Sequence, residues 1–423
     1  MGENRSLSNG QEGNVPKLRF PGFEGEWTSK QFGDIFSFLP NNTLSRAELV
    51  TDGEVLNIHY GDILTKYTSI LNAEYDEIPS IVLGKESKGC SYLQDGDIVI
   101  ADTAEDETAG KALEIINING RKIESGLHTI PCHPNYSYAP MYLGYYINSA
   151  HFHKQLIPLM QGIKVLSVSK SNISKTIISA PNTICEQEKT AFILHLLDCR
   201  IKKQQQVIET LKKYKRGLLS SMFPEKGEAI PKHRFSGFTE PWEQRKLSEL
   251  IIEYKETVES DCELPVLTSS KTEGVLLQEE HFGRKQSHDI TGYNVLPRNY
   301  CTYRNRSDGI DFTFNINKCC DKGIISKFYP VFCGNGNDTF FISLMLNNSD
   351  EVVREIGYTC IGTGQKVLAF SDLLKMYLRV PIYEEQKKIA AYFDNLDHLI
   401  TLHHYKLKMA IKLKESLLQQ LFI

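Results

Sequence analysis

Two lysines of this 423-residue chain stand in the same short motif, Gly-x-Lys-Val-Leu. Lys164 belongs to the segment Gly162-Ile-Lys-Val-Leu166, and Lys366 belongs to Gly364-Gln-Lys-Val-Leu368. A lysine ammonium is a point charge that binds phosphate groups, and phosphate contacts supply most of the affinity of nucleic-acid binding. If the chain binds a nucleic acid, these two lysines are therefore the first candidates for contact with it.

Polar loop residues beside these motifs complete the candidate set. Arginine and lysine match guanine edges, asparagine matches adenine, and hydroxyl groups bond to phosphates. For each candidate, an ordinary solvated polar residue is the alternative. The predicted nucleic-acid-binding residues are Lys111, Lys164, Ser167 and Ser169 in the first half of the chain, and Arg304, Asn305, Arg306, Lys366 and Ser371 in the second half.

No catalytic residue is predicted. An adenine methyltransferase would need an Asn/Asp-Pro-Pro-Tyr motif to hold the flipped base, and the sequence has none. An ATP-binding loop needs Gly-x-x-x-x-Gly-Lys-Ser/Thr, whereas Gly84-Lys85 and Gly110-Lys111 lack the rest of that pattern. The sequence therefore indicates a binding protein without a cofactor of its own.

Metal binding and membrane insertion are not predicted either. The ten cysteines form no Cys-x-x-Cys pair, and the histidines of His151-Phe-His153 and His403-His404 have no partner at ligand spacing. No run of eighteen apolar residues occurs, so we expect a reduced, cytoplasmic protein. The net charge of −4 counts against a nucleic-acid binder, although a local basic surface is compatible with it.

The elements that position the candidates occur twice. The segment Pro16-Lys-Leu-Arg-Phe-Pro-Gly-Phe-Glu-Gly-Glu-Trp27 returns as Pro231-Lys-His-Arg-Phe-Ser-Gly-Phe-Thr-Glu-Pro-Trp242, and these two entry motifs hold the only tryptophans. The Gly-x-Lys motif follows in each copy, then a proline, then a helix that opens with Glu186-Gln187 or Glu385-Gln386. The chain is therefore an internal tandem repeat.

The contents of the two copies differ although their frame is shared. Residues 36–161 and 251–363 cannot be aligned with each other by eye, and both are typical of mixed α/β structure. The turn at Asp95-Gly96 predicts an apolar strand that ends at Ala101, and residues 141–159 and 340–355 predict short helices. We therefore expect an α+β protein with two mixed α/β domains.

Two long helices are predicted from a three-four spacing of seam residues. The first covers residues 184–222, after a capping-box pattern of Thr183 and Glu186, and Pro224 ends it. Such a seam predicts a coiled coil, and a whole domain between the helices lets them pair antiparallel; two solvated helices are the alternative. The seam residues are Leu194, Leu197, Ile201, Gln204, Ile208, Leu211 and Leu218, and Ile389, Phe393, Leu396, Ile400, His403 and Leu407.

The predicted organisation has five parts. Residues 1–15 are polar and form a disordered tail, and residues 16–181 form a first recognition domain. A central spacer helix covers residues 182–223, a second recognition domain covers residues 224–381, and a C-terminal spacer helix covers residues 382–423. The succession of a domain and a helix, twice over, predicts a pseudo-twofold repeat.

From about Pro16 to the end, this arrangement resembles the specificity (S) subunit of type I restriction-modification systems. The resemblance rests on Arg19-Phe-Pro-Gly-Phe and Arg234-Phe-Ser-Gly-Phe with their tryptophans, on the Pro…Glu-Gln helix starts, and on Gly96-Asp-Ile98. Two departures, Arg298-Asn-Tyr300 in place of Gly-Asp-Ile and the polar Asn182-Thr-Ile-Cys185, put in doubt only how similar the loops of the two domains are.

The resemblance implies two target recognition domains that read the two halves of a split, asymmetric sequence in double-stranded DNA. It implies two methyltransferase (M) subunits and restriction/translocase (R) subunits as partners, with S-adenosylmethionine, ATP and Mg²⁺ bound to those partners. Two alternatives stay open. One is a self-sufficient nuclease or methyltransferase with an unrecognised site, and the other is a coiled-coil scaffold that never meets DNA.

Overall fold

The computed structural model describes residues 14–87, 89–225, 227–284, 289–360 and 365–423. Residues 1–13 of the predicted tail and Gly364 of the second lysine motif lie outside the described residues. The chain divides into two compact units. Unit 1 comprises Met1–Gln206 and His404–Ile423, and unit 2 comprises Val207–His403. Each unit thus takes one part of each long helix.

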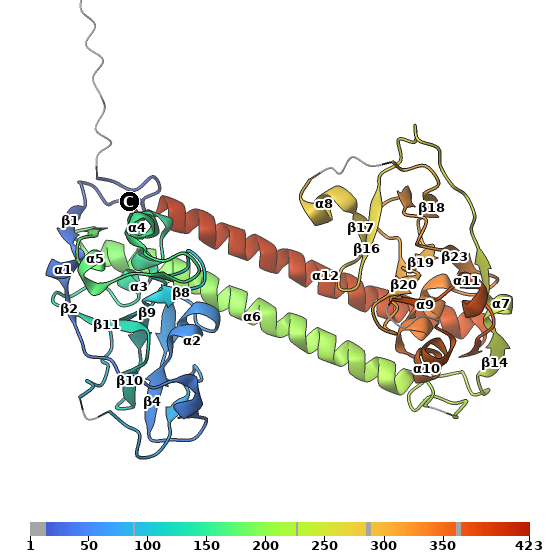
Figure 1. Ribbon diagram of the computed structural model, residues 1–423, viewed down its shortest axis with the longest axis horizontal. Coiled ribbons are helices and arrows are strands. Elements are labelled where there is room, and N and C mark those ends of the chain that lie inside the picture. Colours follow the sequence, from blue (N-terminus) through green and yellow to red (C-terminus); the bar gives the residue numbers. More distant parts are fainter. Residues whose placement is uncertain (1–13, 88, 226, 285–288, 361–364) are drawn as a thin grey trace, which may run out of the picture. The chain divides into compact units, whose positions relative to one another are not determined.

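Among its described residues, unit 1 contains two main sheets and two short strand pairs (Figure 1). The larger sheet has the order β2-β11-β7-β9-β5, the smaller sheet has the order β10-β4-β6-β3, and the pairs are β1-β13 and β8-β12. The strands are β1 Thr28–Gln31, β2 Phe36–Phe38, β3 Leu49–Val50, β4 Val55–Ile58, β5 Ile70–Asn72, β6 Ser80–Ile81, β7 Ile98–Ala101, β8 Thr103–Ala104, β9 Ala112–Ile116, β10 Lys122–Ser125, β11 Thr129–Pro134, β12 Leu166–Ser167 and β13 Ile177–Ala180.

The helices of unit 1 are short apart from its shares of the two long ones. They are α1 Phe32–Ile35, α2 Tyr60–Thr65, α3 Tyr142–Ile147, α4 Ala150–Leu156 and α5 Lys170–Ile173, with 3-10 turns at Arg46–Glu48 and Ile157–Leu159. All four residues of β7 are buried, as the apolar run after Asp95-Gly96 predicts. Gly96 has a positive φ of 87°, which the tight turn before the strand requires.

The part of unit 2 that the structure describes is built from one main sheet and four short strand pairs. The sheet has the order β15-β23-β19-β21, and the pairs are β14-β25, β16-β17, β18-β22 and β20-β24. The strands are β14 Glu243–Lys246, β15 Ile251–Glu253, β16 Leu267–Ser270, β17 Gly274–Leu277, β18 Asn294–Pro297, β19 Cys301–Thr302, β20 Arg306–Ser307, β21 Asn315–Ile316, β22 Lys322–Ile325, β23 Val331–Gly334, β24 Lys366–Val367 and β25 Tyr377–Val380.

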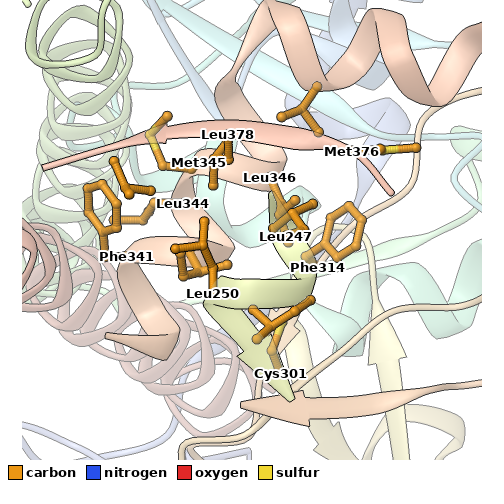
Figure 2. Packing of buried hydrophobic residues seen from close by; sticks show 14 of the residues in the cluster. Leu247, Leu250, Cys301, Phe314, Phe341, Leu344, Met345, Leu346, Met376 and Leu378 are labelled. Carbon is orange, nitrogen blue, oxygen red and sulfur yellow. The ribbon is translucent and has the colours of Figure 1, made fainter. Parts of the chain in front are cut away.

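The core of unit 2 packs its helices on this sheet. The helices are α7 Leu247–Leu250, α8 Gln278–Phe282, α9 Thr339–Asn348, α10 Asp350–Thr359 and α11 Phe370–Leu373. Figure 2 shows Phe341 and Leu346 of α9 packed with Leu247 and Leu250 of α7 and Phe314, all of them buried. These contacts hold α9 against the sheet, and β23 leads directly into α9.

The two units share a sheet that sequence comparison does not reveal. The order β2-β11-β7-β9 in unit 1 corresponds to β15-β23-β19-β21 in unit 2, and β5 extends the sheet of unit 1 alone. Each sheet is followed by helices, α3 and α4 in unit 1 and α9 and α10 in unit 2. The repeat therefore extends through the variable regions, at the level of topology.

Two long helices, α6 Ile184–Met222 and α12 Tyr383–Gln420, pack against each other within each unit. In unit 1, Leu194 near the start of α6 shares a core with Leu417 and Leu418 near the end of α12. In unit 2, Leu219 near the end of α6 shares a core with Ile389 and Phe393 near the start of α12. The helices are thus antiparallel in both units, and the predicted fold class is confirmed.

Polar contacts between the helices repeat as the apolar ones do. In unit 1, Lys414 bonds to Asp198 at 2.6 Å, and in unit 2, Lys215 bonds to Asp397 at 2.5 Å. Lys215 and Lys414 are 199 positions apart in the sequence, and so are Asp198 and Asp397. The predicted seam side chains are buried or partly buried, Gln204 and His403 among the partly buried ones. The pseudo-twofold repeat therefore includes the ion pairs.

The end of each long helix meets the entry motif of one copy in the same way. In unit 2, the backbone N–H of His233 donates to the carbonyl of Ser221 at 2.8 Å, and in unit 1, Leu18 N–H donates to the carbonyl of Gln420 at 2.9 Å. The second entry motif follows α6 closely in the sequence. The first entry motif lies at the other end of the sequence from α12, so their contact is a long-range one. No helix in the described part of the chain is long and apolar enough to cross a lipid bilayer.

Candidate nucleic-acid interface

Each entry motif is fixed to the start of a long helix by a buried ion pair. The Arg19 guanidinium donates to both carboxylate oxygens of Glu186, at 2.8 and 2.9 Å, and Arg234 does the same to Glu385, at 2.7 and 2.7 Å. The two glutamate side chains are 3% and 0% exposed. These hydrogen bonds raise the pKa of both arginines, so the pairs stay charged and anchor the frame.

The glutamines next to these glutamates anchor a second helix. The Gln187 amide donates to the carbonyl of Pro181 and accepts from Ala139 N–H, both at 2.9 Å. Gln386 donates to the carbonyl of Pro381 at 2.9 Å and accepts from Asp338 N–H at 3.1 Å. The twice-repeated Glu-Gln is therefore structural. Each Gln ties the loop before α3 or α9 to the long helix.

The capping-box pattern of Thr183 and Glu186 has a different outcome from the one predicted. The carboxylate of Glu186 accepts from Arg19 and, at 3.3 Å, from the indole N–H of Trp27. Thr183 contributes its backbone carbonyl, which accepts from the N–H groups of Glu186 and Gln187. Sequence reasoning identified both motifs but missed their contact, because Arg19 and Glu186 are 167 residues apart.

Lys164 lies at the exposed tip of a hairpin in unit 1. Gln161 and Ser167 exchange two backbone hydrogen bonds, of 2.9 and 2.8 Å, which close the loop between them. Gly162 has a φ of 124° and no room for a side chain, since a Cβ would stand 1.8 Å from the carbonyl oxygen of Val165. The glycine of the motif is thus required by the turn, and Ile163 and Lys164 are presented to solvent.

The structure does not place Lys366 at the position equivalent to Lys164. In unit 1, β12 pairs with β8 so that Leu166 faces Ala104, and in unit 2, β24 pairs with β20 so that Lys366 faces Ser307. The next backbone bonds, from Val168 to Asp102 and from Leu368 to Asn305, continue the same register. Lys366 therefore corresponds to Leu166, and the predicted equivalence of the two lysines is wrong by two residues.

The predicted serines lie around these hairpins. Ser167 donates to the carbonyl of Gln161 at 3.4 Å, and Ser169 caps α5 by accepting from Asn172 N–H at 3.2 Å. Ser371 is an exposed residue of α11. Ser169 thus has a structural role already, while Ser371 is accessible to a ligand.

Lys111 is partly buried in unit 1. Its ammonium donates to the carbonyls of Leu64 and Tyr67 at 2.9 and 3.1 Å. Burial lowers the pKa of Lys111, and the charge of Lys414 lowers it further. Both lysines line a cavity of about 750 Å³ together with His153.

In unit 2 the structure brings Arg304 and Arg306 together. Both are exposed and line one recess of about 320 Å³. Asn305 between them is only partly exposed, and its side-chain oxygen is buried without a hydrogen-bond partner among the described residues. Lys271 lines the same recess and was missed by the sequence reasoning, because it lies in the β16–β17 turn, far from the shared motifs.

In the part of the chain that the structure describes, no group of three or more His, Cys, Asp or Glu side chains is placed to hold a metal ion. Cys319 and Cys320 are free thiols. The two units therefore repeat the same anchoring ion pairs and glutamine contacts, whereas their exposed polar loops differ.

Comparison with known proteins shows which proteins this chain is similar to. Residues 239–413 match the family of type I restriction modification DNA specificity domains. The fold is similar to the crystal structure of the S subunit of a type I restriction-modification system from M. genitalium, with a TM-score of 0.58 and 11% identity over 97% of this chain and 99% of that chain. No curated protein sequence matches the chain.

Two further solved structures have lower scores. One is described as showing complex assembly and conformational transition of a type I R-M system (TM-score 0.47, 15% identity, 96% of this chain and 99% of that chain). The other is the HsdS subunit from Thermoanaerobacter tengcongensis (TM-score 0.42, 15% identity, 96% and 97%). Residues 239–413 thus match the model of a DNA specificity domain, and the predicted likeness to a type I specificity subunit is confirmed.

Proposed function

We propose that this chain recognises a bipartite, asymmetric sequence in double-stranded DNA, with one half-site for each unit. The observation that carries the proposal is the contrast between the units. Their anchoring residues repeat, as Arg19–Glu186 and Arg234–Glu385 do, while the residues at their hairpins do not. Equal frames with different polar loops suit two different half-sites, because base edges are read by loop side chains.

The long helices would act as the spacer between the half-sites. The α6 helix has 39 residues, which corresponds to about 58 Å at ~1.5 Å per residue. Such a length would span roughly 1.7 turns of duplex DNA, at ~34 Å per turn. The base pairs between the half-sites would then not be read.

The repeated frame would serve as the docking surface for two copies of one partner. We expect two methyltransferase subunits, and restriction/translocase subunits in addition, because an S subunit of this kind works within such a complex. S-adenosylmethionine, ATP and Mg²⁺ would bind to those partners, and this chain would be the non-catalytic DNA-recognition subunit. That division of roles also accounts for the net charge of −4, because the partners would contribute to DNA affinity.

The experiment mixes the purified chain with duplex DNA, first alone and then with a type I methyltransferase (M) subunit from the same organism. We expect sequence-specific binding with the partner present, and no strand cleavage or methyl transfer by the chain alone in the presence of Mg²⁺ and S-adenosylmethionine. Catalysis by the chain alone would favour the self-sufficient enzyme. Absence of any DNA complex with the partner present would favour the coiled-coil scaffold.

A further inference from the structure

The strand that pairs with β12 in unit 1 and with β24 in unit 2 carries two arginines in unit 2 only. The register of β8 with β12 and of β20 with β24 makes Thr103 equivalent to Arg306, and Ala101 equivalent to Arg304. The strand continues into the exposed acidic run Glu105-Asp-Glu107 in unit 1 and into Ser307-Asp308 in unit 2. At the positions of the two arginines, unit 1 thus has the uncharged residues Ala101 and Thr103, and its acidic run begins at Glu105, which corresponds to Asp308.

The backbone around the two arginines is held on both sides. Asn305 N–H donates to the carbonyl of Phe328 at 2.9 Å, and its carbonyl accepts from Leu368 N–H at 3.0 Å. The neighbouring Tyr303 is fully buried, and its hydroxyl donates to the carbonyl of Leu368 at 3.1 Å. Because side chains alternate along an extended strand, Arg304 and Arg306 share the exposed side.

Aromatic and ionic contacts position the cations of the recess before a ligand arrives. The guanidinium carbon of Arg306 lies 4.5 Å from the ring centroid of Phe328, and stacking of this kind leaves the N–H groups at the edge of the guanidinium directed away from the ring. Lys271 bonds to Asp311 at 2.5 Å, and Ser307 donates to the other oxygen of Asp311 at 3.1 Å. A pre-positioned arginine loses less side-chain entropy on binding an anion.

We propose that this recess of unit 2 binds a backbone phosphate of the DNA, through Arg304 and Arg306, and that the equivalent loop of unit 1 makes no phosphate contact. The inference rests on the proposed function and assigns the electrostatic part of DNA binding mainly to the second half-site. Asp311 already neutralises Lys271, so the two arginines carry the contact. In unit 1, the equivalent residues Ala101 and Thr103 offer no cation, and the exposed Glu105 and Glu107 that follow them would repel a phosphate nearby.

The test measures the affinity of the full chain, with its methyltransferase partner, for a duplex of random sequence at increasing salt concentration. Random sequence isolates the phosphate contribution, because non-specific binding is electrostatic. We expect Arg304→Ala and Arg306→Ala to weaken binding, and the slope of log affinity against log salt to fall by about 0.9 for each phosphate that the variant no longer binds. The matched control is Arg354→Ala, which removes an exposed arginine of α10 in the same unit and should change neither quantity.

Two charge-neutralising variants separate weaker phosphate binding from misfolding. Asp308→Asn, at the edge of the recess, should tighten binding, and Glu105→Gln in unit 1 should leave it unchanged. The inference would be overturned if both arginine variants kept the parent's affinity and its slope of log affinity against log salt. It would also be overturned if the variants lost affinity only for duplexes of particular sequence, with that slope unchanged. If the parent complex binds no duplex at all, the proposed function itself fails, which is a distinct result.

Discussion

Removing one glutamate from each anchoring ion pair should destabilise the two units unequally. Glu385→Ala removes the ionic partner of Arg234, whose side chain is only 12% exposed. The Nη1 atom of Arg234 has no hydrogen-bond partner among the described residues even when Glu385 is present. Breaking a buried pair in this way costs about 3–5 kcal/mol. Glu186→Ala leaves Arg19 with the carbonyls of Gly25 and Glu24, at 2.7 and 3.1 Å. Since a hydrogen bond to a charged group contributes about 1.5–3 kcal/mol, we expect the cost in unit 1 to be lower by about that amount.

The two tryptophans make this difference measurable. Trp27 is buried beside the Arg19–Glu186 pair and Trp242 is buried in the equivalent entry motif of unit 2. With Trp27→Phe or Trp242→Phe as background, fluorescence during urea unfolding reports on one unit at a time. We expect the midpoint to shift further for Glu385→Ala, reported by Trp242, than for Glu186→Ala, reported by Trp27.

A control and a refuting outcome follow from the same geometry. The double change Arg234→Met with Glu385→Ala removes the unpaired charge, so it should lose less stability than Glu385→Ala alone. Equal losses in the two units would show that the carbonyls of Gly25 and Glu24 do not compensate Arg19. A double variant as unstable as the single one would show that the unpaired arginine is not the cause.

Three further predictions concern pH, modularity and spacing. Burial raises the pKa of Glu114 to about 7 in unit 1, above its ordinary value of 4.5. A carboxyl group whose pKa is higher in the folded state loses stability as pH rises between those values, so the free energy of unfolding of unit 1 should fall from pH 4.5 to 7, and Glu114→Gln should remove that slope in urea titrations. Exchanging residues 36–161 for those of a relative should change one half of the methylated target in sequencing, and a change in both halves would contradict the modularity of the two units. Shortening α6 and α12 together by two heptads should shorten the gap between the half-sites, and an unchanged gap would rule out the spacer role.

The parts of the fold that follow from local or repeated sequence could be predicted. The long helices follow from apolar residues such as Leu194, Leu197 and Ile208, whose three-four spacing depends only on their own segment. The tandem frame follows from identical residues, Arg19 with Arg234 and Trp27 with Trp242. The two arginines are identical because each makes the same ion pair with the start of a long helix.

What could not be predicted depends on strand register and on distant pairing. The common sheet order of the two units requires only that strands such as β7 and β19 be apolar. Few identical residues therefore remain by which the two variable regions could be aligned. Lys164 and Lys366 match in letters, yet the pairing of β12 and β24 separates them by two positions. Lys271 joins Arg304 and Arg306 only because a distant turn folds over them.

The contact of α12 with the first entry motif has a consequence for the order in which the chain folds. The core of unit 1 contains Leu421 and Phe422, and the Phe422 ring lies 5.4 Å from that of Tyr146. The equivalent Phe223 directly follows α6 and is available to unit 2 from there. A ribosome therefore releases every residue of unit 2 before it releases the last ones of unit 1. The half that is synthesised first is completed last, and until then its apolar surface around Tyr142 and Tyr146 stays uncovered.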